Sequence, residues 1–365
     1  TLSDGSISGG QKYYIEKSFN KRWAGVLFAA LMIICAIGSG NMPQINNIAS
    51  VLDSTFSIPK LTTGLVLGVM LWMIIAGGIK RIAKIASKLV PIMAVIYFGG
   101  ALVVVAENYQ NIIPSFHSIF SQVFSGSAAA GGFLGASFAM SLKLGVARGL
   151  YSNEAGQGSS PIAHASAKAE HSVEQGMVSI LEPFIDTIVV CSVTALVILS
   201  SGAWTQKYDN TFERSSMAIF AGYYAESNSK DVEELGKYIL DARNFTSDTT
   251  NVENFTGSLD LIDGQMQKQN VTVFHNNSIA EDVVFYQGTE PVSGLLEISD
   301  GKIADSSVRV EGKSLIHAAE LTSKAFASGV LGIYGEYIVA IGLLLFAFST
   351  AIAWSYYGDR STAYI

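Results

Sequence analysis

Long apolar stretches alternate with short basic segments over the first 204 residues of the chain, and one more apolar stretch follows near its end. A helix that crosses a bilayer needs about 20 predominantly apolar residues, so this pattern predicts six spans and an all-α polytopic membrane protein. Acidic residues occur in the fifth stretch, which has Glu182 and Asp186 near its start. The predicted spans are residues 23–52, 61–79, 89–106, 108–142, 177–204 and 337–357.

The residues between the fifth and sixth spans follow a different pattern. Apolar positions have helical spacing over 231–243, and four short β-like runs come after it, with turn signals such as Asp300-Gly301 between them. These runs are residues 271–274, 283–286, 295–298 and 308–310. The sequence therefore predicts a membrane core, 1–204 and 314–365, and a small α+β insert, 205–313.

Charge separates the same two regions. Residues 206–313 hold 18 acidic and 9 basic residues, a net charge of −9; the whole chain carries −7, so the remainder sums to +2. Outside the insert, lysine and arginine concentrate in alternate short loops, which predicts that these loops are cytoplasmic and that the insert lies outside a plasma (inner) membrane. The basic segments are 12–22, 80–88, 143–168 and Arg360.

Composition narrows the class of protein. Hydrophobic residues make up 49% of the chain and charged residues only 15%, where soluble proteins average about 25% charged. This excludes a disordered chain, a coiled coil and a nucleic-acid-binding domain, and it makes the lipid bilayer the expected partner. Cys35 and Cys191 lie in apolar stretches, so neither a disulfide nor a metal site is predicted. No catalytic motif is present, and we expect neither enzymatic activity nor a cofactor.

Two of the predicted spans contain breaks. In the first, Pro43 follows two glycines, and Asn41, Gln44 and Asn47 recur on one helical face. Such amides either hold helices together or face a substrate pathway. The fourth span is too long for one crossing, and a short amphipathic segment, 112–124, precedes its glycine cluster. This pattern is typical of a discontinuous helix at a transport site, or of close helix packing. The glycines are Gly126, Gly131, Gly132 and Gly135.

The sixth span ends in a hydroxyl pair, Ser349 and Thr350, close to Phe346. Hydroxyl and backbone carbonyl oxygens are the hard ligands that an alkali cation prefers. Such hydroxyls also commonly bond their own helix backbone, and both interpretations stay open at this point.

The segment after the fourth span is the most specific in the chain. It runs Gly145-Val146-Ala147-Arg148-Gly149-Leu150-Tyr151-Ser152-Asn153-Glu154-Ala155-Gly156-Gln157-Gly158-Ser159, and then Pro161-Ile162-Ala163-His164. Other notable segments are Gly40-Asn41-Met42-Pro43-Gln44, Phe184-Ile185-Asp186-Thr187 and 346–350. In order along the chain, these segments resemble the alanine or glycine:cation symporter family, also called sodium:alanine symporters.

The resemblance implies two five-helix inverted repeats, of which the six spans would be core helices three to eight. It implies symport of alanine or glycine with sodium, or with a proton, by alternating access. On this scheme Asn41, Gln44 and the segment with Met140, Leu142, Leu144 and Gly145 would bind the substrate. Ser349 and Thr350, with Phe346, would bind sodium.

The chain also departs from the family pattern. It begins at Thr1 rather than Met and ends eight residues after its last span, so we expect a truncation at both ends, with the family's first core helix missing. Pro43 stands where the family usually has an aliphatic residue. The insert is unusual, and it suggests an alternative function: an amino-acid receptor, derived from a transporter, that signals through the outer domain.

A group of polar residues remains near the cytoplasmic end of the fourth span and in the fifth. Glu154, with Ser152 and Asn153, either orders the loop or forms an inner gate in which Glu154 pairs with Arg148 or Lys168. Asp186 is an intramembrane carboxylate and therefore a functional candidate. Its alternatives are pairing with Lys143 or bonding to the hydroxyls of Thr187 and Thr194.

Overall fold

The computed structural model describes residues 8–125, 138–167, 169–242, 250–267 and 270–365. The chain folds into two compact units. The helical unit comprises Thr1–Tyr109, Val146–Ser201 and Thr322–Ile365, and the second unit comprises Gln110–Gly145 and Gly202–Leu321.

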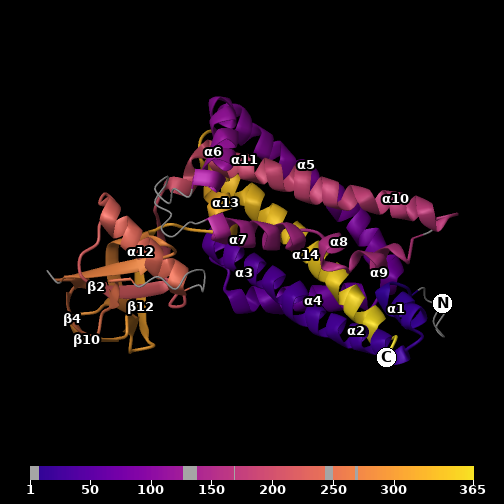
Figure 1. Ribbon diagram of the computed structural model, residues 1–365, viewed down its shortest axis with the longest axis horizontal. Coiled ribbons are helices and arrows are strands. Elements are labelled where there is room, and N and C mark those ends of the chain that lie inside the picture. Colours follow the sequence, from indigo (N-terminus) through magenta and orange to yellow (C-terminus); the bar gives the residue numbers. More distant parts are fainter. Residues whose placement is uncertain (1–7, 126–137, 168, 243–249, 268–269) are drawn as a thin grey trace. The chain divides into compact units, whose positions relative to one another are not determined.

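One long helix near the C-terminus, α14 (Ile333–Thr362), organises the helical unit. It packs against α2, α3, α4, α5 and α9, and its small buried residues allow this close approach. Figure 1 shows α14 in yellow between these helices. The other helices are α1 (Gln11–Phe19), α2 (Arg22–Cys35), α3 (Met42–Phe56), α4 (Lys60–Ile75), α5 (Gly78–Glu107), α8 (Glu154–Gln157), α9 (Ser160–His164), α10 (Ser172–Pro183) and α11 (Cys191–Ser201).

Two π-helical segments interrupt the long helices of this unit. The segment η1 (Ala36–Asn41) joins α2 to α3, and η3 (Phe184–Val190) joins α10 to α11. A proline lies close to each segment: Pro43 is two residues after the end of η1, and Pro183 directly precedes η3. Because proline has no N–H to donate, the α-helical hydrogen-bond ladder is interrupted beside it. The break predicted in the first span is confirmed, as a π-helical insertion in a continuous helix.

Four of the six predicted spans are confirmed as helices long and apolar enough to cross a membrane, within the described residues. They cover Arg22–Asp53, Arg81–Glu107, Val173–Ser201 and Ile333–Thr362. The second predicted span is too long by the structure: α4 ends at Ile75, and Gly78 starts the next helix with φ +67°, a conformation that favours glycine.

The fourth predicted span is not one helix from residue 108. A 3₁₀ turn, η2 (Tyr109–Asn111), leads to α6 (Ile112–Ser125), which confirms the predicted amphipathic segment. Helix α7 (Phe138–Tyr151) follows and passes from the second unit into the helical unit. The glycine cluster at 126–135 lies outside the described residues. A further helix shared by both units, α13 (Ala318–Ala327), precedes α14.

The rest of the second unit is largely antiparallel β-structure, with orders β1-β12-β8-β9, β11-β10-β4-β5 and β3-β2-β6-β7 in its sheets. Strand pairing buries an apolar core that includes Ile219, Leu259 and Phe285, and α12 (Ser229–Ala242) covers a smaller cluster with Leu235. The helix and four strands predicted from the sequence are present here. The strands are β1 (Tyr208–Thr211), β2 (Met217–Ala221), β3 (Glu253–Asn254), β4 (Gly257–Ile262), β5 (Gln265–Met266), β6 (Val271–His275), β7 (Ser278–Ile279), β8 (Glu281–Gln287), β9 (Glu290–Pro291), β10 (Gly294–Ser299), β11 (Lys302–Ile303) and β12 (Val308–Ser314), after the 3₁₀ turn η4 (Ala203–Thr205).

Candidate functional site

A cavity of about 710 Å³ opens beside η1 in the helical unit. The side chain of Asn41 forms part of its wall. The Asn41 amide nitrogen donates to the Ala36 carbonyl at 2.8 Å and to Ser355 Oγ of α14 at 3.4 Å. Its amide oxygen is buried and has no hydrogen-bond partner among the described residues. A buried acceptor without a donor is costly. The lining residues are Ile37, Asn41, Met42, Ile45, Asn46, Ala49, Lys60 and Leu71.

The other predicted substrate residues are not gathered at this cavity. Gln44 is half-buried in α3 but does not line it. Leu142 and Leu144 are exposed and lie with Gly145 in the second unit, whose position relative to the helical unit is not described. Nothing is described of the Met140 side chain. The role of these residues stays a prediction.

The hydroxyl pair on α14 bonds its own helix. Ser349 Oγ donates to the Phe346 carbonyl at 2.8 Å, and Thr350 Oγ1 donates to the same carbonyl at 3.0 Å. This is the local bonding that such hydroxyls commonly adopt. It uses the two hydroxyl protons and leaves lone pairs on both oxygens, so it is compatible with cation binding at this turn.

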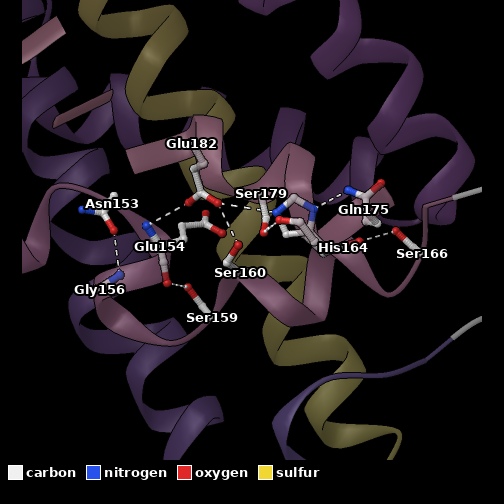
Figure 2. A network of polar contacts seen from close by, with 12 residues as sticks. Asn153, Glu154, Gly156, Ser159, Ser160, His164, Ser166, Gln175, Ser179 and Glu182 are labelled. Carbon is white, nitrogen blue, oxygen red and sulfur yellow. Dashed lines mark hydrogen bonds and ion pairs between the residues drawn. The ribbon is translucent and has the colours of Figure 1, made fainter. Parts of the chain in front are cut away.

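A polar network joins the short helices α8 and α9 to α10, as Figure 2 shows. At its centre, the Glu182 carboxylate accepts from the Glu154 backbone N–H at 3.1 Å and from Ser160 Oγ at 2.7 Å. It also faces His164 Nε2 at 3.5 Å. Asn153 caps α8 by accepting the Gly156 N–H at 2.6 Å, which is the usual role of asparagine at a helix N-terminus. One carboxylate therefore holds two short helices in place.

The contact at Nδ1 of His164 indicates which of its two ring nitrogens carries the proton. The amide nitrogen of Gln175 lies 2.5 Å from Nδ1, and an amide nitrogen can only donate. Nδ1 is then the acceptor, and Nε2, which lies 3.5 Å from Glu182 Oε2, carries the ring proton.

The side chain of Glu154 points toward α14 and accepts a hydrogen bond from the Tyr357 hydroxyl. Burial raises the pKa of Glu154 to about 7; the Tyr357 hydrogen bond opposes this rise, and the charges of Glu182 and Asp186 add to it. The structure thus gives Glu154 a different partner from the predicted Arg148, which is exposed, or Lys168, which lies outside the described residues.

The polar groups around Asp186 also differ from the prediction. Asp186 lies in η3, and its Oδ2 is buried without a hydrogen-bond partner among the described residues. Thr187 bonds Ser152 at 2.7 Å and Asn153 at 2.9 Å, and Thr194 bonds Tyr97 at 2.6 Å. The neighbouring hydroxyls therefore have other partners.

Two tyrosines in this region, Tyr357 and Tyr151, were not predicted as site residues from the sequence. Thr350, Trp354 and Tyr357 follow one another at spacings of four and three, so all three share a face of the sixth span. That spacing is the signal that could have identified Tyr357. Tyr151 adjoins the predicted Ser152 and Asn153, but the sequence contains no sign of its partner on η1.

Known proteins resemble this chain over the same segments. A model of the sodium:alanine symporter family matches residues 1–229 and 303–365. An uncharacterized transporter of Bacillus subtilis, YflA, is 42% identical over 203 residues, which cover 56% of this chain and 43% of the relative. Methanococcus maripaludis AgcS, named a sodium/alanine symporter, is 42% identical over 207 residues, 55% and 45% of the two chains.

A third relative is GlnT of Bacillus subtilis, named a probable sodium/glutamine symporter. It is 41% identical over 196 residues, which cover 54% of this chain and 40% of the relative. The chain spans less than half the length of these curated relatives.

The residues that the family model matches include the first 204, with Asn41, the network around Glu154 and both π-helical segments, and the whole of α14. The family is one of transporters rather than enzymes, and four long apolar helices agree with a multi-pass membrane protein. The chain belongs to the sodium:alanine symporter family.

Proposed function

We propose that the full-length protein imports a small neutral amino acid, alanine or glycine, together with sodium by alternating access. Family membership and the names of relatives such as AgcS support sodium-coupled symport. The observation that carries the proposal in this chain is the cavity beside η1, which is lined in part by Asn41, a residue whose amide oxygen is buried and has no partner among the described residues. We place the protein in the plasma membrane with residues 205–313 outside.

The cavity chemistry suits such a substrate. An ammonium group donates hydrogen bonds, and the Asn41 oxygen can accept one. The apolar side chains of Ile37, Ile45 and Leu71 offer a surface for a methyl group rather than for a charge. A small substrate is therefore favoured by apolar contact and by pairing of an otherwise unsatisfied acceptor.

Sodium would bind at Ser349 and Thr350, with the Phe346 carbonyl nearby. These residues lie on α14, which packs directly against η1. The hydrogen bond from Asn41 to Ser355 joins the two elements, because Ser355 lies on α14 beyond the hydroxyl pair. A cation that orders this part of α14 would thereby favour the substrate-binding form of η1, which is the coupling that symport requires.

Glu154, Ser152, Asn153 and Arg148 would form the inner gate, with Asp186 close by. In this proposal α8 and α14 are held together by Glu154 and Tyr357 when the cytoplasmic side is closed. Opening would break that contact.

Vesicles that contain the full-length protein are expected to accumulate labelled alanine only under an inward sodium gradient. The measurement compares sodium with potassium gradients at constant membrane potential. Equal uptake under both gradients would contradict sodium coupling, and competition by unlabelled glycine but not glutamine would support the proposed substrate class.

Replacing Asn41 with alanine is expected to raise the alanine KM about tenfold, because loss of a hydrogen bond to a charged group costs about 1.5–3 kcal/mol. Asn47→Ala is the matched control, since Asn47 lies on α3 and does not line the cavity. Initial uptake rates over a range of alanine concentrations measure both. Equal effects of the two substitutions would remove Asn41 from the site.

A further inference from the structure

The two π-helical segments carry the polar residues that the proposed transport step needs. The segment η1 contains Ser39 and Asn41, and η3 contains Asp186 and Thr187. π-helical turns are rare and occur frequently at functional sites. Their hydrogen-bond ladder is imperfect, so their geometry depends on contacts from outside the helix.

A side chain from another helix bonds the backbone of η1. In this π-helical segment the Met42 N–H donates to the Ile37 carbonyl, five residues back, so the N–H that Pro43 lacks would have bonded the Gly38 carbonyl. The Tyr151 hydroxyl donates to the next carbonyl, that of Ser39, at 2.8 Å. Tyr151 therefore supplies η1 with a donor from outside the helix, beside the break in its hydrogen-bond ladder.

The next two residues bind the other π-helical segment. Ser152 Oγ donates to the Gly149 carbonyl at 3.0 Å, so its only proton is used there. In the 2.7 Å pair of Ser152 and Thr187, Thr187 is then the donor, and it accepts in turn from the Asn153 amide at 2.9 Å. The hydrogen bonds therefore all have the same donor-to-acceptor order: Asn153 donates to Thr187, Thr187 donates to Ser152, and Ser152 donates to the Gly149 carbonyl.

Three consecutive residues, Tyr151, Ser152 and Asn153, therefore connect η1 to η3. We propose that Tyr151 and Thr187 are positioning residues for transport, which hold the two π-helical segments in the arrangement that binds substrate. Tyr151 acts on the cavity through Ser39, two residues before Asn41. Thr187 holds η3 to the same three residues. This inference rests on the proposed function, because the reaction that is positioned is alanine transport.

The test of Tyr151 is the substitution Tyr151→Phe in the full-length protein. It removes the side-chain donor to the Ser39 carbonyl and is expected to raise the alanine KM about tenfold. An alanine KM within twofold of the wild-type value would overturn the role assigned to Tyr151.

Thr187 is tested with a pair of substitutions. Thr187→Val keeps the shape and removes the hydroxyl, and it is expected to raise the alanine KM severalfold with little change in the amount of folded protein. Thr187→Ser restores the hydroxyl and is expected to return the KM to the wild-type value. Failure of serine to restore the wild-type KM would overturn the role of Thr187.

Tyr334→Phe serves as the control for Tyr151→Phe, because Tyr334 is an exposed tyrosine at the start of α14.

A second measurement separates this inference from the proposed function. Thermal unfolding of the purified variants in detergent reports the Tyr151–Ser39 bond whatever the substrate is. If the wild type does not transport alanine but Tyr151→Phe lowers the melting temperature and Tyr334→Phe does not, the substrate is wrong and the connection between the segments stands. If Tyr151→Phe leaves the melting temperature unchanged, the inference fails.

Discussion

Replacing Glu154 with glutamine is expected to abolish the dependence of transport on cytoplasmic pH between about 4.5 and 7. Burial raises the pKa of Glu154 from 4.5 to about 7 while it contacts Tyr357. When α8 and α14 separate, the pKa returns toward 4.5, so the closed contact binds the proton more tightly. The stabilisation of that contact is complete below pH 4.5, the equilibrium constant of the contact falls about tenfold per pH unit above that, and the stabilisation is lost as the pH rises through 7.

The glutamine side chain resembles the protonated carboxyl group and does not titrate, so the gate should keep its low-pH behaviour at every pH. Vesicles with the internal pH set between 5 and 8, at a constant sodium gradient, measure this effect. Glu174→Gln is the control, because Glu174 is an exposed carboxylate in the first turn of α10. An unchanged pH profile for Glu154→Gln would remove Glu154 from the gate.

The double substitution Ser349→Ala with Thr350→Ala is expected to raise the sodium concentration for half-maximal uptake by about a hundredfold. Each hydroxyl oxygen lost from a cation costs about 1.5–3 kcal/mol, roughly tenfold in affinity. The helix itself should persist, since alanine is the best helix former and the lost bonds go to a carbonyl of the same helix. Uptake of alanine at increasing sodium concentrations measures the change.

A control for this prediction lies on the same helix. Thr362 donates to the Gly358 carbonyl at 2.9 Å, the same local bond that Thr350 makes, but at the end of α14. Thr362→Val should leave the sodium requirement unchanged. If both variants keep the wild-type requirement, Ser349 and Thr350 bond only their own backbone and sodium binds elsewhere.

Some features of the fold were predictable because they depend on short stretches of chain. A bilayer requires a long apolar run for each crossing, so four spans could be read from hydropathy alone. Pro43 acts on the carbonyl one turn before it, which made the break in the first span predictable. The second predicted span was too long because hydropathy does not register the positive φ at Gly78, where α5 begins.

The candidate site was less predictable, because its polar groups find partners far along the chain. Asn41 was singled out as a residue of a polar face, and the structure adds that it lines a cavity. The partner of Glu154 was not foreseen: two basic residues nearby in sequence were expected, and the structure has Tyr357, 203 residues away. Local charge patterns identify which residues are costly to bury, but not which donors reach them.

The amino-acid sequence by itself determined four of the membrane spans, the break beside Pro43, the acidic insert and the resemblance to the family, because each depends on neighbouring residues or on a matching order of motifs. Only the tertiary structure decided that Tyr151 bonds the Ser39 carbonyl and that Thr187 completes the link to η3. The reason is physical: a buried polar group must be paired, and which partner is within hydrogen-bond distance is set by how distant helices pack.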